Sequence, residues 1–400
     1  MHVIRKTNSK GGTGNMKKKV LGIILTAAIA MSLAACGSSS AAKTTSSAAS
    51  SKASDTSTVE SVVESVAESA ASEGTTSAKT ASGDVVTVGF SQVGAESDWR
   101  TANTTSMKNT FSSANGYNLI FDDAQQKQEN QITAIRNFIQ QEVDYIVLAP
   151  VTETGWDTVL QEAKDADIPV IIVDRMVNVS DDSLYTAWVG SNFKLEGQKA
   201  CAWLKAYAEA KNIAAGDLHI VDIQGTIGAS AQIGRSEGMS EAAKANGWDL
   251  LASESGEFTQ AKGQEVMESF IKQYDNINVV YCENDNEAFG AIDALTAAGK
   301  TVGGDIANGQ VMVMSFDSTK AGLTDTLSGQ ITLNTECNPL HGPRVQKIIE
   351  TLKSGGTPDK TAYVDEEMFS ADKTVTSVTV DGADYKVTEL TQDVLSARAY

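Results

Sequence analysis

The sequence predicts an α/β protein, and two observations lead to that fold class. Apolar runs of strand character recur ten times along the chain from Asp84 onward. Amphipathic segments of helical length lie between nearly all of these runs, as in Gln131–Ile139, where apolar residues follow the i, i+3, i+4, i+7 spacing of a helix. Such alternation is typical of parallel sheets with right-handed crossovers. Because ten strands are many for one sheet, we expect two Rossmann-like lobes of about five strands each.

The expected strands fall into two sets. The first set is Val85–Phe90, Asn118–Phe121, Tyr145–Ala149, Val170–Val173 and Tyr185–Gly190, and the second is Leu218–Gln224, Asp249–Ser253, Val279–Cys282, Val311–Phe316 and Ile331–Thr335. In open α/β sheets, ligands bind beyond the carboxyl ends of the strands. Side chains that follow these strands are therefore the first candidates for a binding site.

The N-terminal part of the chain is expected to be an export signal and a tether. Residues 1–15 precede a better start at Met16 and are interpreted as a misplaced extension. Residues 16–35 begin with a basic segment, continue with an apolar run too short for a membrane span, and end in small residues before Cys36. They resemble a lipoprotein signal peptide with Cys36 as the lipidated residue, and a plain secretory signal is the alternative. Residues 37–83 are mostly Ser, Ala, Thr and Glu, a composition that cannot bury enough apolar surface to fold.

Charge and cysteine content argue against several classes of function. The chain has 400 residues, 51 acidic and 32 basic side chains, and a formal charge of −19. This acidity repels phosphate backbones and argues against nucleic-acid partners. Cys201, Cys282 and Cys337 show no metal-ligand spacing, so no metal or cofactor is expected. Cys201 should be buried on a helix face, whereas a bridge between Cys282 and Cys337 stays open. His219 is interpreted as a core histidine, and His341 opens a helix.

Polar and aromatic side chains follow several of the expected strands. They are Glu96, Ser97, Asp98, Trp99 and Arg100 after the first strand, Asp174 and Arg175 after Val170–Val173, Arg235 in the helix after Leu218–Gln224, Asn284 after Val279–Cys282, and Asp317 after Val311–Phe316. Their shared position relative to the strands predicts that they meet in one cleft.

The chemistry of this set suits a neutral sugar. Trp99 lies in a charged loop and offers a flat apolar face for the C–H bonds of a ring, and Phe258 could do the same from the other lobe. Arginines supply rigid donors and aspartates supply acceptors for hydroxyl groups, while an asparagine such as Asn284 does both. Because a buried charge must be paired, we expect Asp174 and Asp317 also to contact cleft arginines. Asp285 is expected to cap the helix that follows it.

Several segments resemble a known family. VTVGFSQVGAESDWR, QQKQENQ, EAKDADIPVIIVDR, GRSEG and MSFD are similar to the ribose/galactose-type periplasmic binding proteins of bacterial sugar ABC transporters, and within that family to the galactofuranose-binding members. The resemblance runs from about Val85 to about Gly355. It implies a periplasmic-binding-protein type I fold, in which two lobes joined by three strands at a hinge close on a ligand. It also implies a first sugar-binding lobe of residues 84–187 and 338–360, and a second of residues 188–337 and 361–400.

The resemblance further implies a role and partners. The family's ligand contacts fall on Glu96 to Arg100, Asp174, Arg175, Arg235, Asn284 and Asp317 of this chain. The implied protein is an extracytoplasmic, lipid-anchored monomer that captures a monosaccharide and delivers it to an ABC permease with a cytoplasmic ATPase. The chain departs from the family at Asp98, Met176 and residues 336–341, which leaves the exact sugar open. A pentose ligand is one alternative, and a receptor module for a sensor kinase or chemoreceptor is another.

An enzyme is not expected. Interlocked aspartates and arginines favour ionised carboxylates, whereas a general acid needs a raised pKa. The sequence contains no Gly-x-Ser-x-Gly nucleophile elbow. A transcription regulator of the same fold would carry a helix-turn-helix at its N-terminus, where this chain has an export signal.

Overall fold

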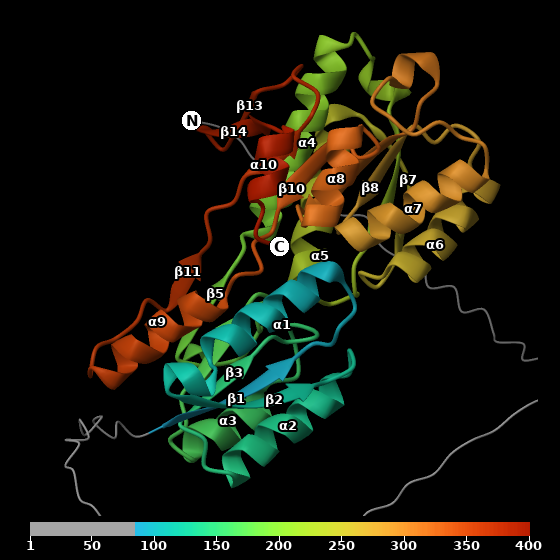
Figure 1. The fold of residues 1–400 in the computed structure, drawn as a ribbon. Helices are drawn as coiled ribbons and strands as arrows, with labels where there is room; N and C mark the ends of the chain where they lie inside the picture. The colour runs from blue at the N-terminus through green and yellow to red at the C-terminus, as the bar shows by residue number, and fades with distance from the viewer. Residues whose placement is uncertain (1–84) are drawn as a thin grey trace, which may run out of the picture. The chain divides into compact units, whose positions relative to one another are not determined.

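The computed structural model describes residues 85–400 (Figure 1). The expected extension, signal peptide, lipidated Cys36 and tether all lie outside the described residues. All ten expected strands are present, with ends that differ from the expected ones by no more than two residues. They form two sheets that are mainly parallel, which confirms the predicted fold class. In this part of the chain, no helix has the length and apolarity of a membrane span.

The first lobe is built on a six-stranded parallel sheet with the strand order β11-β5-β4-β3-β1-β2. Its elements are β1 Val86–Gln92, α1 Asp98–Thr110, β2 Tyr117–Asp123, α2 Gln128–Gln140, β3 Tyr145–Leu148, α3 Asp157–Asp165, β4 Val170–Val173, β5 Ala187–Gly190, α9 Gly342–Lys353 and β11 Thr361–Tyr363. Every residue of β4 is buried, as expected for a strand covered by helices on both faces. One apolar cluster packs α1 and α9 on the sheet, and another packs α2 and α3 on it.

The second lobe is built on an eight-stranded sheet with the order β13-β14-β12-β10-β9-β8-β6-β7. Its elements are α4 Phe193–Ala210, β6 His219–Gln224, α5 Ser230–Asn246, β7 Asp249–Ser255, α6 Gln260–Gln273, β8 Val279–Cys282, α7 Asp285–Ala297, β9 Met312–Asp317, α8 Lys320–Ser328, β10 Leu333–Glu336, β12 Met368–Ser370, β13 Ser377–Val380, β14 Ala383–Glu389 and α10 Gln392–Ala397. Helices α4 and α5 approach closely because Gly238 faces Gly197. A Cβ atom on Gly238 would lie 2.8 Å from the Gly197 carbonyl carbon.

Four short 3-10 turns connect these elements. They are η1 Ser113–Asn115, η2 Asp182–Leu184, η3 Ala215–Asp217 and η4 Ile306–Asn308.

The chain passes between the lobes three times, through residues 191–192, 337–341 and 364–367. These three crossing segments follow β5, β10 and β11. Strand pairing corrects two expected boundaries. Trp188 and Val189 pair with β4, and Thr361–Tyr363 pairs with β5, so both segments belong to the first lobe and not to the second. The reason is that each strand completes its pairing in the first sheet before the chain crosses.

The C-terminal segment adds strands that the sequence analysis did not predict. Strand β12 pairs antiparallel with β10, and β13 and β14 form a hairpin. Its two-residue turn is Asp381-Gly382, and both residues have positive φ angles. An Asp-Gly pair between alternating strands is a strong hairpin signal, because such turns need two residues that tolerate positive φ.

Candidate ligand-binding site

A cavity lies between the two lobes at the carboxyl ends of their strands. Its lining comprises Glu96, Ser97, Trp99, Arg100, Asp174 and Arg175 from the first lobe, Phe193, Ala231, Arg235, Phe258 and Asp317 from the second, and Cys337 from a crossing segment. Nine of the eleven predicted site residues are therefore brought together. This confirms that residues scattered in sequence meet in one cleft.

The cavity is narrow. Its empty space totals about 290 Å³. The lobes touch at its rim, where the Met176 amide donates to the Ser230 hydroxyl at 2.8 Å and the Asp98 amide donates to Asn286 Oδ1 at 3.0 Å. A monosaccharide therefore needs a small opening of the two lobes to enter.

Helix α1 positions the first group of side chains. Ser97 caps the helix by accepting a hydrogen bond from the Arg100 amide at 3.1 Å, and this fixes Trp99 and Arg100 in the first turn. The Trp99 indole donates to the Cys337 carbonyl at 2.6 Å. The Arg100 guanidinium lies 4.6 Å from the centre of the Trp99 ring and donates to Glu96 Oε1 at 2.9 Å. Trp99 is therefore held by contacts on its face and its edge, so its orientation is fixed.

Asp174 and Arg175 follow β4 directly. Asp174 Oδ2 lies 2.8 Å from Arg100, which confirms the expected contact with a cleft arginine. Arg175 donates to the Val151 carbonyl at 3.0 Å, lies 3.7 Å from Glu96 Oε1, and stands 5.0 Å from the centre of the Phe258 ring. Burial and the neighbouring Arg100 lower the pKa of Arg175 to about 10, so it remains a cation at neutral pH.

Arg235 anchors the wall formed by the second lobe. It donates from Nε to Glu196 Oε2 at 2.8 Å and also donates to the Glu283 carbonyl. Its Nη2 lies 3.7 Å from Asp317 Oδ1, so the second expected aspartate–arginine contact is also present. The guanidinium also packs on the rings of Phe193 and Phe316, whose centres are 5.4 Å and 4.7 Å away. This packing leaves Arg235 little freedom to move.

Three cleft residues adopt backbone conformations that are unusual for residues other than glycine. The φ angles are 64° at Asp174, 60° at Phe258 and 94° at Asp317. Such conformations cost of order 1–3 kcal/mol and persist where the surrounding structure enforces them, often at ligand sites. In this chain the three residues lie just after β4, just after β7 and at the end of β9, and their side chains line the cavity.

The cavity is rich in charges that largely balance each other. Three guanidiniums, from Arg100, Arg175 and Arg235, face the carboxylates of Glu96, Asp174 and Asp317, and Glu196 lies behind Arg235. Burial raises the pKa of Asp317 well above its usual range, although Arg235 opposes this shift, so Asp317 departs from the expectation that the cleft aspartates stay ionised. With its charges already paired, the site suits a neutral ligand rich in hydroxyl groups better than an ion.

Comparison with known proteins places the chain in a family. Residues 88–335 match a model described as a periplasmic binding protein domain. The chain belongs to this family. The galactofuranose-binding protein YtfQ of Escherichia coli strain K12 is 41% identical over 292 residues, which cover 72% of this chain and 88% of that protein. The matched family and this relative are solute-binding proteins, which supports the expectation of a non-enzymatic protein.

Solved structures give the same picture. A Mycobacterium smegmatis protein in complex with β-D-fucofuranose is 41% identical, with a TM-score of 0.67 over 72% of this chain and 92% of that chain. The binding component of an arabinose ABC transporter from Shewanella sp. ANA-3, bound to L-arabinofuranose, is 38% identical, with a TM-score of 0.67 over 72% of this chain and 93% of that one. Both support the two-lobed periplasmic-binding-protein type I fold.

Two predicted site residues of this binding protein do not line the cavity. Asp98 is exposed on the outer side of α1, because Trp99 and Arg100 occupy the inward positions of that turn. Asn284 is buried but acts locally. It caps α7 by accepting from the Glu287 amide at 2.8 Å, and it donates to the Phe258 carbonyl at 3.1 Å. Asn284 therefore supports Phe258 from behind.

The expected cap of α7 is also corrected. Asp285 does not cap the helix, because Asn284 holds the extended cap position. The Asp285 carboxylate instead turns inward and accepts hydrogen bonds from Ser315, Thr319 and Asn334 at 2.7–2.8 Å.

Sequence reasoning missed three residues that line the cavity of this binding protein: Phe193, Ala231 and Cys337. Phe193 comes three residues after β5 and Cys337 directly after β10, so the strand-end rule applied to every strand would have found both. Ala231 lies in the first turn of α5, and its small apolar side chain gave no signal.

The histidines and cysteines have structural environments. His219 is half-buried and paired with Asp249 at 3.0 Å. The expectation that it is a core residue is therefore wrong. His341 is fully buried, its Nδ1 lies 3.0 Å from Asn103 Nδ2, and burial lowers its pKa to about 4. The three cysteines within residues 85–400 are buried and unbridged, which confirms the expected burial of Cys201 and excludes the bridge between Cys282 and Cys337.

Proposed function

We propose that this chain binds a monosaccharide, in a furanose form related to galactofuranose, in the cavity between its lobes. The observation that carries the proposal is the constellation of Trp99, Phe258 and three paired arginines around one enclosed space. The two aromatic rings come from different lobes, so both contact a ring-shaped ligand only when the lobes are together.

The charge pairing supports a neutral ligand. Each cleft arginine already has a carboxylate partner within 3.7 Å, so an anionic ligand would have to displace a buried carboxylate. A sugar hydroxyl can instead accept from a guanidinium and donate to a carboxylate at the same time. Hydrogen bonds to charged groups are stronger than those between neutral groups, so a few such hydroxyls would supply both affinity and orientation.

The relatives support a five-membered ring. Four of those that are 38–41% identical carry galactofuranose, fucofuranose or arabinofuranose in their names or titles.

A thermal-shift screen tests this proposal. The panel contains L-arabinose, D-galactose, D-fucose, D-ribose and D-fructose, each of which contributes some furanose form in solution, and synthetic methyl galactofuranoside. A ligand at 100 times its Kd stabilises the native state by about 2.7 kcal/mol, which raises Tm measurably. We expect the galactofuranoside or L-arabinose to give the largest shift. A flat response to the whole panel would contradict sugar binding.

We further propose that the protein is a monomeric lipoprotein, held outside the cell by Cys36, and that it delivers the sugar to an ABC permease. Its membership of the periplasmic binding protein family and its export-signal pattern support this role. Metabolic labelling with an alkynyl fatty acid tests the anchor, with Cys36→Ala as the matched variant. Cells that lack the chain should lose sugar uptake. Cys36→Ala should restore uptake only when the variant protein is retained at the membrane, and this result would support delivery.

A further inference from the structure

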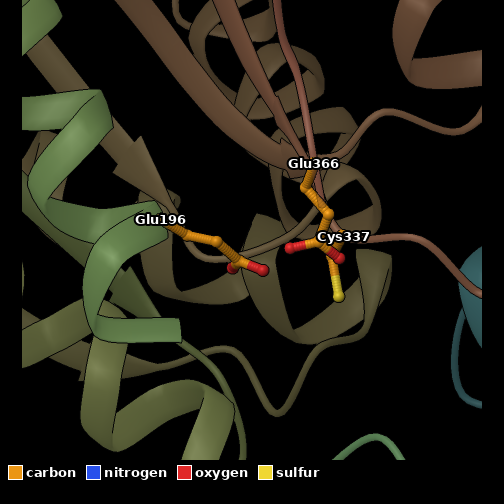
Figure 2. A group of neighbouring side chains, drawn as sticks. All are labelled: Glu196, Cys337 and Glu366. Carbon is orange, nitrogen blue, oxygen red and sulfur yellow. The ribbon is translucent and has the colours of Figure 1, made fainter. Parts of the chain in front are cut away.

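The three crossing segments converge on a cluster of potential metal ligands behind the sugar cavity. Glu196 lies in the first turn of α4, just after the first crossing; Cys337 lies on the second crossing and Glu366 on the third. One donor atom from each side chain lies within 4.8 Å of the other two. Figure 2 shows the Glu196 carboxylate directed from α4 toward the side chains of Cys337 and Glu366.

The hydrogen bonds around the cluster leave one carboxylate oxygen of each glutamate available, and the Cys337 sulfur lies 3.4 Å from the Ser191 hydroxyl. Glu366 Oε1 accepts from the Ser191 hydroxyl at 2.5 Å and from the Asn338 amide at 2.8 Å. Glu196 Oε2 accepts from Arg235 at 2.8 Å. No N–H or hydroxyl group of the described residues donates a hydrogen bond to the other oxygen, Glu196 Oε1, although the residue is 1% exposed, and the facing group is the Glu366 carboxyl, which hydrogen-bonds to the Glu196 carboxylate.

An unpartnered carboxylate oxygen at this depth is costly, because burial removes its water. The cost is higher here because a second carboxylate faces it. Burial and the proximity of Glu196 raise the pKa of Glu366 well above its usual range. Nearby charges are Arg235, already shared with Asp317, and Lys199, which donates to the Glu366 backbone carbonyl at 3.1 Å. Neither supplies a cation between the two carboxylates.

We propose that Glu196, Cys337 and Glu366 form a binding site for a zinc-type divalent cation at the junction of the three crossing segments. The donor set of one sulfur and two oxygens suits Zn²⁺, which takes Cys, His and carboxylate ligands in tetrahedral geometry. Ca²⁺ and Mg²⁺ require six or more oxygen ligands and do not use thiolates, so they do not fit. Three protein ligands leave one coordination position for water.

The geometry needs little adjustment. A tetrahedral Zn²⁺ with bonds of roughly 2.0–2.3 Å holds its ligand atoms roughly 3.3–3.8 Å apart. The three donors, already within 4.8 Å, therefore need to move together by about an ångström. Glu366 is only partly buried, which gives an ion a path from solvent.

Binding at this site releases a proton. An ordinary cysteine thiol has a pKa of about 8.5 and is mostly protonated at neutral pH. A thiolate is the form that binds Zn²⁺, so the Cys337 proton leaves to solvent when the Zn–S bond forms. The Glu366 carboxyl also loses any proton it carries. Affinity should consequently rise with pH.

The site is tested by calorimetric titration of the chelator-treated full chain with Zn²⁺ alone. We expect one Zn²⁺ per chain, with a binding heat that varies with the ionisation enthalpy of the buffer because protons are released. Ca²⁺ and Mg²⁺ should give no heat. Co²⁺ should produce a near-ultraviolet thiolate charge-transfer band, which reports Cys337 ligation directly. Absence of Zn²⁺ binding, or equal binding of Ca²⁺, would overturn the proposal.

Two substitutions locate the ion. Cys337→Ser and Glu366→Gln should each weaken Zn²⁺ binding at least about tenfold, the smallest effect expected when a partner of a metal site is lost. The matched controls are Cys201→Ser, a second buried cysteine, and Glu367→Gln, the exposed neighbour of Glu366; both should bind Zn²⁺ like the parent. If Cys337→Ser does not fold, Glu366→Gln and the Co²⁺ band keep the test decisive. Unchanged Zn²⁺ affinity in both ligand variants would refute the site. A second result would also refute it: the metal-free protein becomes more stable to unfolding at low pH, and Glu366→Gln abolishes this gain. The two carboxylates would then be held together by a shared proton and not by a metal ion.

Discussion

Replacement of Arg175 by alanine tests the electrostatic design of the cleft. The wild-type guanidinium donates to the Val151 carbonyl at 3.0 Å, lies 3.7 Å from Glu96 Oε1, and stands 5.0 Å from the Phe258 ring centre. We expect Arg175→Ala to remove one charge-assisted hydrogen bond to a sugar hydroxyl, worth about 1.5–3 kcal/mol. Glu96 keeps its contact with Arg100 at 2.9 Å, which limits the additional cost of an unpaired carboxylate. The expected loss is therefore about 2 kcal/mol, or roughly a 30-fold increase in Kd.

Isothermal calorimetry with the best sugar from the thermal-shift panel measures this change. Arg136→Ala is the matched control. It removes an arginine of the same lobe whose pairing with Glu162 at 2.7 Å is on the surface, and we expect an unchanged Kd. Arg175→Lys keeps the charge but not the planar fork, so its Kd should fall between those of the parent and the alanine variant. Equal affinity of Arg175→Ala and the parent, or an equal loss in Arg136→Ala, would refute the reasoning.

Three further substitutions probe the support of the site. Trp99→Phe keeps a ring but leaves the buried Cys337 carbonyl without its donor at 2.6 Å. Urea unfolding should show a free energy of unfolding about 1 kcal/mol lower than that of the parent, and an unchanged value would mean that the indole nitrogen is dispensable. Asn284→Ala removes the cap of α7 and the support of Phe258. Urea unfolding should show a free energy of unfolding lower by about 1–2 kcal/mol, and calorimetry should show weaker sugar binding. His341 has a native pKa of about 4 against 6.5 in the unfolded chain, so only the unfolded state binds its proton in that window and stability falls with falling pH. Between pH 6.5 and pH 4 the free energy of unfolding, measured in urea, should fall by roughly 3 kcal/mol more in the parent than in His341→Gln. The same dependence of this free energy on pH in both proteins would contradict the prediction.

The sequence by itself determined the fold class and most of the cavity. Periodicity is a local property: a buried parallel strand such as β4 must be apolar throughout, and a covering helix such as α2 must carry an apolar stripe, so both are legible in the chain. The cavity followed from a topological rule, because parallel strands place the residues after their carboxyl ends at one edge of the sheet. That rule located Asp174, Arg175 and Asp317 without any knowledge of distances.

Only the tertiary structure decided which neighbouring side chain faces the cavity. Asp98 and Trp99 are adjacent in sequence, yet the helical turn sends one to solvent and the other inward. Asn284 likewise took the cap role expected of Asp285, because the backbone at Asn284 is extended, and the Asp285 carboxylate turned inward to Ser315, Thr319 and Asn334.

The convergence of Glu196, Cys337 and Glu366 was equally invisible in the sequence, since 170 residues separate the first from the last (366 − 196). Sequence patterns report which face of a strand or helix is apolar. The positions of polar side chains relative to one another depend on how separate elements pack, and that information exists only once the chain has folded.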